Sequence, residues 1–140
     1  EVARRAPIPM INIVQTACDR VRSLGLKRLG LFGTGFTMRG RFYPETFARS
    51  GLELVAPKAE EQAFIHEKYI HELLENQFLP ATRTALLAII DRMRAEERIE
   101  ALILAGTELP LLLRGAEPEG LLFLDTTRIH VNAAFDAILE

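Results

Sequence analysis

The segment ALILAGTELP, Ala101–Pro110, is highly informative, because five apolar residues lead directly into a glycine, a hydroxyl and a carboxylate. A similar arrangement occurs earlier in LGLFGTG, Leu29–Gly35, where an apolar run ends in Gly-Thr-Gly. Short continuous apolar runs are typical of strands that are covered on both faces of a sheet. In open α/β sheets, ligands bind at the carboxyl ends of such strands. The two loops are therefore the first candidates for a functional site.

Helical stretches separate the apolar runs, and this alternation is the signature of an α/β fold with a mainly parallel sheet. Helical periodicity is clearest at Ile65, Tyr69 and Leu73. The prediction is a three-layer, Rossmann-like domain with helices on both faces of the sheet. We expect strands at Pro9–Ile13, Leu29–Phe32, Leu52–Val55, Ala101–Ala105 and Leu122–Leu124, and helices at Val14–Leu24, Tyr43–Arg49 and Glu60–Glu75, from Pro80 through Met93, and after Asp125 through Leu139.

The composition indicates a single globular domain. The 140 residues are 49% hydrophobic and 26% charged, with a net charge of -2, which is ordinary for a soluble protein and speaks against a nucleic-acid surface. The apolar stretches are strand-sized, so we expect no membrane span. Cys18 is the only cysteine, which excludes an internal disulfide and fits a reducing cytoplasm. Because the chain starts at Glu1 rather than Met, we expect an amino-terminal part to precede it.

The loop that begins at Gly33 has a dinucleotide-like glycine pattern, but its spacing is wrong. The third glycine of that pattern would fall at position 38, which is Met38. An anion-binding turn explains the residues better, because glycines let backbone N–H groups converge and Thr34 and Thr37 add hydroxyl donors. A plain strand-to-helix turn with Thr37 as a helix cap explains them as well. Both interpretations stay open at this stage.

The segment Gly106-Thr107-Glu108-Leu109-Pro110 also allows two interpretations. As a helix start, Thr107 would be the cap, Glu108 would favour the positive helix end and Pro110 would suit the first turn. As a binding site, Thr107 and the adjacent N–H groups would hold a ligand anion. Glu108 would then hold an ammonium group.

The remaining polar candidates have simpler explanations. Asp125 is a natural N-cap for the last helix. His130 follows it and is either a proton-transfer group or a structural histidine. His66 and His71 are five positions apart, about 140° around a helix, whereas a zinc pair needs a spacing of four, so we reject a metal site. Cys18 lies on an apolar helix stripe and is expected to be an inert core residue.

Three segments together resemble the cofactor-independent aspartate/glutamate racemase family. They are LGLFGTGFTMRGRFY (Leu29–Tyr43), LILAGTELPLLL (Leu102–Leu113) and LFLDTTRIHVNAA (Leu122–Ala134). The resemblance implies that the chain is the larger, carboxyl-terminal part of such a protein and forms one α/β domain over residues 1–140. Residues 28–115 would be the core of the second of two similar domains. Residues 1–27 and 116–140 would cross into that domain and return from it.

In that family, two cysteines face opposite sides of the substrate α-carbon, and one removes the proton while the other delivers one. The resemblance places the second cysteine at Gly106, so that position is vacant here, and Cys18 belongs to a helix too early in the chain to replace it. Some members hold the substrate's side chain with a lysine after the Tyr69 helix, where residues 76–79 supply no cation. The resemblance implies substrate-binding roles for Thr34, Thr37, Thr107 and Glu108.

The leading hypothesis is an isomerase of amino-acid metabolism that transfers a proton at the carbon next to a carboxylate, with no cofactor. We expect a small carboxylate or amino acid as ligand, a cytoplasmic homodimer, and no nucleic-acid or membrane partner. Three alternatives stay open: a one-thiol decarboxylase or lyase, a silent relative that binds a small carboxylate, and a structural domain that dimerises through apolar helix faces. The residues that precede Glu1 would separate chemistry from binding.

Overall fold

The fold is built on one parallel sheet. The computed structural model describes residues 12–139, and within them four strands pair in the order β2-β1-β3-β4. The strands are β1 (Arg28–Phe32), β2 (Glu53–Val55), β3 (Ala101–Leu104) and β4 (Leu122–Asp125). All three strand pairs are parallel, so the predicted mainly parallel sheet is confirmed.

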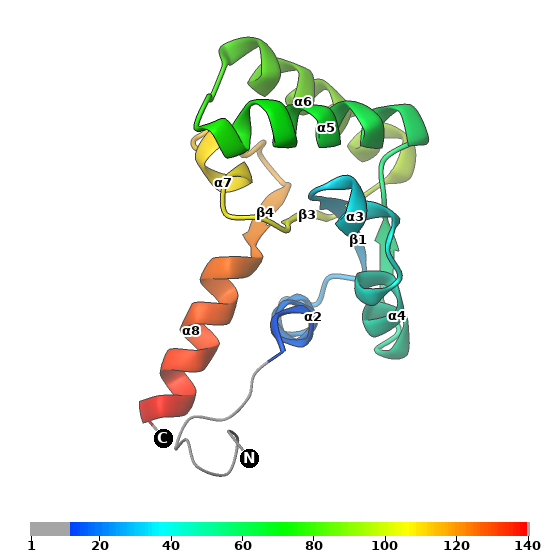
Figure 1. Cartoon of the computed structure of the whole chain (residues 1–140). Helices are drawn as coiled ribbons and strands as arrows, with labels where there is room; N and C mark the ends of the chain where they lie inside the picture. The colour runs from blue at the N-terminus through cyan, green and yellow to red at the C-terminus, as the bar shows by residue number, and fades with distance from the viewer. Residues whose placement is uncertain (1–11, 140) are drawn as a thin grey trace.

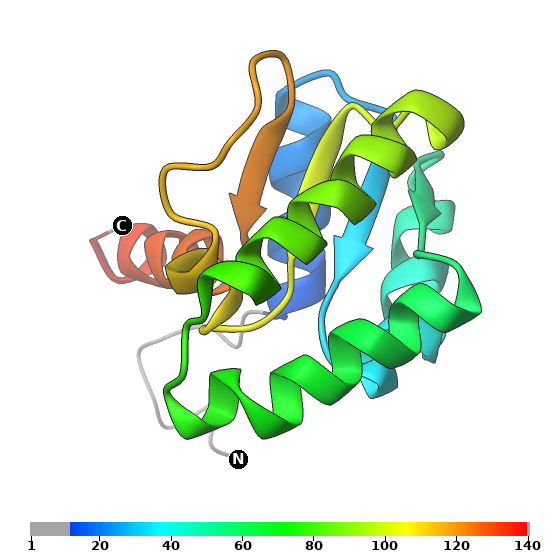
Figure 2. The same cartoon turned by 90° about the horizontal axis from the view of Figure 1, so that it is seen from above.

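Helices connect the strands and cover both faces of the sheet (Figure 1). They are α2 (Ile13–Ser23), α3 (Gly35–Arg39), α4 (Phe42–Arg49), α5 (Ala59–His71), α6 (Pro80–Arg92), α7 (Leu109–Leu112) and α8 (Thr126–Leu139). Viewed from above, α6 crosses in front of the strands, α5 runs past their carboxyl ends, and α2 lies behind the sheet (Figure 2). The three-layer α/β prediction is therefore confirmed.

Alternation along the strands divides the core between the two faces. Leu29, Leu31 and Ile103 pack with α2 and α4, whereas Phe32 and Leu102 pack with α5 and α6. Each of these five side chains is buried. Successive strand residues point to opposite faces, so strands that are buried on both faces need apolar residues at every position. The continuous apolar runs in the sequence follow from this requirement.

The helix starts follow local capping chemistry. The Asn12 side chain accepts hydrogen bonds from the N–H groups of Val14 and Gln15 at 2.8 and 3.1 Å, and this cap opens α2. The strand expected at Pro9–Ile13 is wrong at Ile13, where the helix begins, and its residues 9–11 lie outside the described part of the chain. Asp125 accepts from the N–H of Arg128 at 3.1 Å, as expected for the cap of α8.

Helix α5 ends earlier than the periodicity predicted. The expected helix over Glu60–Glu75 stops at His71 and continues as a 3₁₀ turn over Leu73–Glu75. The tighter turn brings Leu73 into the core at 2% exposure and ends at Asn76, whose φ of 62° is left-handed. Pro80 then opens α6, as predicted.

A salt bridge joins α5 to α6. Arg92 donates from Nε to Glu61 Oε2 and from Nη2 to Glu61 Oε1, both at 2.6 Å. Glu61 also accepts from the N–H of Lys58 at 2.9 Å and so closes the start of α5. A paired, two-point contact of this kind fixes orientation as well as distance. It holds the two helices in register above the sheet.

Candidate functional site

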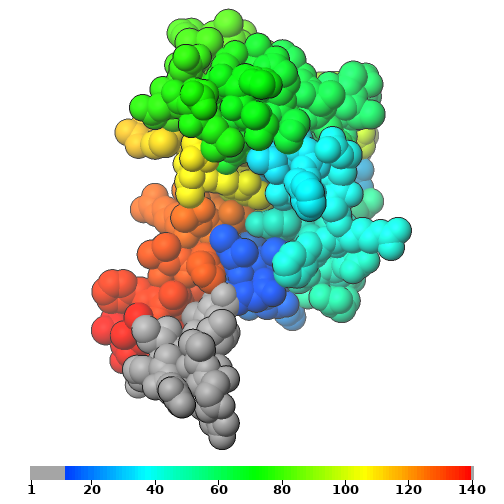
Figure 3. Space-filling view, viewed as in Figure 1, coloured from blue at the N-terminus to red at the C-terminus, as the bar shows by residue number. Residues whose placement is uncertain are grey.

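Two loops leave the sheet side by side. In the register of β1 and β3, Phe32 pairs with Leu104, and the N–H of Ala105 donates to the carbonyl of Phe32 at 2.9 Å. A Cβ on Gly33 would lie 3.1 Å from the carbonyl oxygen of Ala105, so the two loops touch. In the space-filling view, the cyan segment after β1 lies beside the yellow segment after β3 (Figure 3). Both loops therefore open at the carboxyl edge of the sheet.

The loop after β1 is a strand-to-helix turn with Thr34 as its cap. The hydroxyl of Thr34 accepts from the N–H of Thr37 at 3.4 Å, and the two threonine hydroxyls are 3.4 Å apart. Thr37 as the cap, which was one of the two interpretations, is wrong, because α3 already begins at Gly35. The N–H of Gly35 donates to Nδ1 of His66 at 2.8 Å. This N–H is engaged within the fold, so the hydroxyls are the groups to consider for a ligand.

The loop after β3 is organised around a tyrosine and a carboxylate. Tyr69 donates a hydrogen bond from its hydroxyl to Oε1 of Glu108 at 2.7 Å. Burial, and then this contact with Glu108, raise the pKa of Tyr69. Burial tends to raise the pKa of Glu108, but the hydrogen bond from Tyr69, together with the nearby Thr107 hydroxyl, outweighs this effect, and the pKa lies below the ordinary 4.5. Near neutral pH, the pair is a neutral phenol and an ionised carboxylate.

Thr107 is not the cap of the short helix that follows. Helix α7 begins at Leu109, and Glu108 precedes it without a side-chain capping bond. Pro110 lies in the first turn, as expected. Thr107 is exposed and lines an open cavity of about 540 Å³ together with Arg114 and Arg128. The sequence pattern gave no reason to single out these two arginines, which come from a loop and from the first turn of α8.

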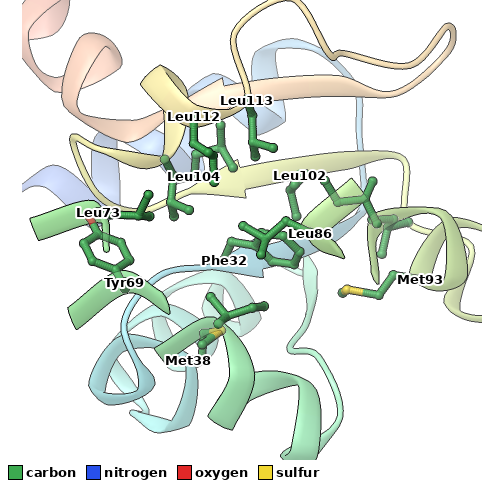
Figure 4. Packing of buried hydrophobic residues seen from close by; sticks show 14 of the residues in the cluster. Phe32, Met38, Tyr69, Leu73, Leu86, Met93, Leu102, Leu104, Leu112 and Leu113 are labelled. Atoms are coloured by element: carbon green, nitrogen blue, oxygen red, sulfur yellow. The ribbon is translucent and has the colours of Figure 1, made fainter. Parts of the chain in front are cut away.

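Gly106 lies directly against Tyr69. A Cβ built on Gly106 would lie 1.9 Å from the Tyr69 hydroxyl oxygen and 2.8 Å from Cζ. Sequence reasoning assigned Tyr69 to the core because it shares an apolar stripe with Ile65 and Leu73, and the core assignment is correct (Figure 4). Periodicity carries no information about where a buried hydroxyl points. The contact between Tyr69 and Gly106 was therefore missed.

Helix α5 reaches both loops from one face. His66 contacts the loop after β1, and Tyr69, three residues later, contacts the loop after β3. Residues three apart lie on the same side of a helix. One helix therefore fixes the positions of both candidate loops.

The other predicted residues lie elsewhere. His130 is on α8, and its Nδ1 is buried without a hydrogen-bond partner among the described residues, so its role stays a prediction. Cys18 is fully buried on α2, as expected for a core residue. Residues 12–139 contain no group of three or more metal-binding side chains. None of their helices is both long and apolar enough to cross a bilayer.

The amino-acid sequence matches one protein family over nearly the whole chain and resembles a bacterial protein over most of it. Residues 1–134 match the family described as Asp/Glu/Hydantoin racemase. An uncharacterized protein in the pnlA 3' region of Pectobacterium carotovorum subsp. carotovorum is 24% identical in a match that covers 74% of this chain and 67% of that protein.

Solved structures show the same fold over nearly all of the chain. An aspartate racemase homologue from Pyrococcus horikoshii OT3 is 28% identical, with a TM-score of 0.87 over 99% of this chain. A candidate Asp/Glu racemase from Yersinia pestis is 24% identical, with a TM-score of 0.89 over 99% of this chain. The chain spans 60% of the length of each of these two structures. On the match over residues 1–134, the chain belongs to the Asp/Glu/hydantoin racemase family.

Proposed function

We propose that the chain supplies one wall of a site at which the complete protein transfers a proton at the carbon α to a carboxylate, without a cofactor. The observation that carries the proposal is the meeting of two unlike loops at one edge of the sheet. One loop offers the hydroxyls of Thr34 and Thr37, and the other offers the ionised Glu108. A donor cluster beside a carboxylate suits a zwitterion, which carries a carboxylate and an ammonium group.

In this proposal the hydroxyls of Thr34, Thr37 and Thr107 hold carboxylate oxygens, and Glu108 holds the ammonium group. Gly106 is the vacant position of the second thiol. His130 is the first candidate for an additional proton-transfer group, because imidazole exchanges protons near neutral pH. The division into a core at 28–115 with crossing segments at 1–27 and 116–140 belongs to the same proposal. So do the cytoplasmic location and the homodimer.

A silent, amino-acid-binding relative is the second candidate function. The position of the Tyr69 hydroxyl favours it, because a side chain at residue 106 would collide with that hydroxyl. With no thiol at this strand end, chemistry would depend on His130 or on groups outside the described residues. A decarboxylase or lyase of the one-thiol kind would need only a single thiol supplied from outside the described residues.

Binding tests the proposal directly. The ¹⁵N-labelled chain is titrated with aspartate, glutamate and succinate while its amide resonances are followed. We expect shifts at Thr34, Thr37 and Thr107, and tighter binding of aspartate than of succinate, which lacks the ammonium group. Glu108→Gln should lower the affinity for aspartate and leave the affinity for succinate unchanged. Glu75→Gln, which changes an exposed carboxylate on the 3₁₀ turn, is the matched control. Shifts confined to other surfaces would contradict the proposal.

A further inference from the structure

Gly106 is required for space rather than for backbone conformation. Its φ is not in the positive range that favours glycine, unlike the φ of Gly25, Gly51, Gly115 and Gly120. A Cβ at this position would lie 1.9 Å from the Tyr69 hydroxyl oxygen, 2.8 Å from Cζ and 3.1 Å from Cε2. Two of these distances are below 3.0 Å, which real Cβ atoms essentially never reach. The tyrosine therefore fills the volume that a side chain at residue 106 would need.

Moving the Tyr69 ring out of that volume would cost both core packing and a hydrogen bond. Only 4% of its surface is exposed, and it packs in the core beside α5 and α6 with Leu73 and Leu104. Its hydroxyl is also bonded to Glu108, so a displaced ring would leave the half-buried carboxylate without this donor. Unmaking a hydrogen bond to a buried charged group is costly. Packing and hydrogen bonding thus hold the ring in the same place.

We propose that Tyr69 is a positioning residue of the candidate site, which substitutes for a side chain at residue 106 and fixes Glu108 as an anionic wall. This inference rests on the proposed function, in which Glu108 binds the ammonium group of the ligand. The phenol donates a hydrogen bond to the carboxylate and keeps its proton, and a donor of this kind stabilises the ionised form of the carboxyl group. This end of β3 therefore presents the fixed negative charge of Glu108 to the ligand, rather than a proton-donating side chain at residue 106. Amino acids fit such a wall better than carboxylic acids without a cationic group.

The first test measures the space itself and needs no ligand. Gly106→Ala is placed in three backgrounds: the parent chain, Tyr69→Leu, and Tyr43→Leu. Tyr43 is the matched control, because it is also buried but packs on the opposite face of the sheet. We expect Gly106→Ala to lower the thermal midpoint by about 3 °C or more in the parent and Tyr43→Leu backgrounds. In Tyr69→Leu it should cost little or nothing. An equal loss in all three backgrounds overturns the proposal.

The second test follows Glu108 directly. The Glu108 side-chain carboxyl carbon is titrated by ¹³C NMR and assigned with Glu108→Gln. Tyr69→Phe removes only the hydroxyl, and we expect the midpoint of the Glu108 titration to move to higher pH. Tyr43→Phe should leave the midpoint where it is in the parent chain. No difference between the two variants would mean that Tyr69 does not hold the carboxylate in its ionised form.

A ligand measurement separates this inference from the proposed function. With aspartate and succinate as probes, Tyr69→Phe should lower the affinity for aspartate about three- to tenfold and leave the affinity for succinate unchanged. If the parent chain binds neither probe, the proposed function fails, and the first two measurements still decide whether Tyr69 positions Glu108. If aspartate binds and Tyr69→Phe weakens both probes equally, the ammonium assignment is wrong.

Discussion

Nδ1 of His66 accepts a hydrogen bond from the backbone N–H of Gly35 over 2.8 Å, so a helix side chain anchors the first turn after β1. To accept this bond, Nδ1 must carry no proton, and a neutral ring then carries its proton on Nε2. His66 is half-buried. The contact joins two segments that are 31 positions apart in the chain.

Removing this acceptor should loosen the loop that holds Thr34 and Thr37. His66→Phe keeps the ring volume but leaves the Gly35 N–H without its partner, so we expect a loss of about 1–3 kcal/mol in the free energy of unfolding. Urea unfolding measures the loss. His71→Phe on the same helix is the control, because His71 is exposed, and it should change stability little. Long-range ¹⁵N NMR of His66 should show the Nε2–H tautomer, and the Nδ1–H tautomer would contradict the hydrogen bond.

Acid should destabilise the chain. Burial tends to raise the pKa of Glu61, but the hydrogen bond from Arg92 and further contacts lower it, and the pKa of Glu108 is lowered as well. A carboxyl whose folded pKa lies below its ordinary 4.5 stabilises the fold above that pH. The contribution is lost as the pH falls through the folded pKa. We expect urea stability to be level from pH 7 to about 5 and to fall at lower pH. A rise in stability on acidification would contradict this.

The Glu61–Arg92 pair should account for part of that acid dependence. The side chains of both residues are at most 16% exposed, so the pair is only weakly screened. Arg92→Met leaves a half-buried carboxylate without its two-point partner and should cost about 1.5–3 kcal/mol at pH 7. The cost should shrink as Glu61 becomes protonated. An Arg92→Met penalty that is the same at pH 3 and pH 7 would exclude an electrostatic origin.

The chain alone should not exchange the α-proton of aspartate or glutamate. Its single thiol, Cys18, is fully buried in the core on α2. NMR in heavy water measures the exchange, and we expect none above the uncatalysed rate. A thiol reagent should label Cys18 only after the chain unfolds. Exchange that persists in Cys18→Ala would mean that another group performs the chemistry.

Restoring a thiol at residue 106 should require two substitutions. In the complete protein, Gly106→Cys alone should disturb the fold, because its Cβ meets the Tyr69 hydroxyl. Gly106→Cys combined with Tyr69→Leu vacates the space. If the preceding part carries the first thiol of the pair, inversion of aspartate should rise about 10²–10⁴-fold in the double variant. Circular dichroism follows the inversion, and aspartate binding is measured beside it. If the double variant binds aspartate as well as Tyr69→Leu alone does and inversion is no faster, residue 106 is not the second thiol position.

The sequence predicted those elements whose positions depend on a single local pattern. Continuous apolar runs predicted the strands, and Pro80 and Asp125 marked the starts of two helices. The end of α5 was not predicted, because the hydrophobic spacing continues through Leu73 and does not distinguish a 3₁₀ turn from another turn of α-helix. One of the two interpretations of this loop made Thr37 the cap of α3, because the presence of two threonines does not indicate which of them begins the helix.

The candidate site was predicted only in part, for a physical reason. Thr34 and Glu108 follow strands, and the strand ends of a parallel sheet share one edge, so these residues were within reach of sequence reasoning. Tyr69 and His66 approach from a helix on one face of the sheet, and their contacts depend on the helix's rotation and tilt. Hydrophobic spacing gives the buried side of a helix but not the atoms that its side chains meet.

The collision at Gly106 also restricts the order in which relatives can diverge. A lineage with a side chain at this position cannot acquire tyrosine at residue 69 in the present geometry until that side chain has been lost. In the reverse direction, Tyr69 must shrink before residue 106 can regain a side chain. The two positions therefore change as an ordered pair, and ancestors between the two forms should carry glycine at 106 together with a smaller residue at 69.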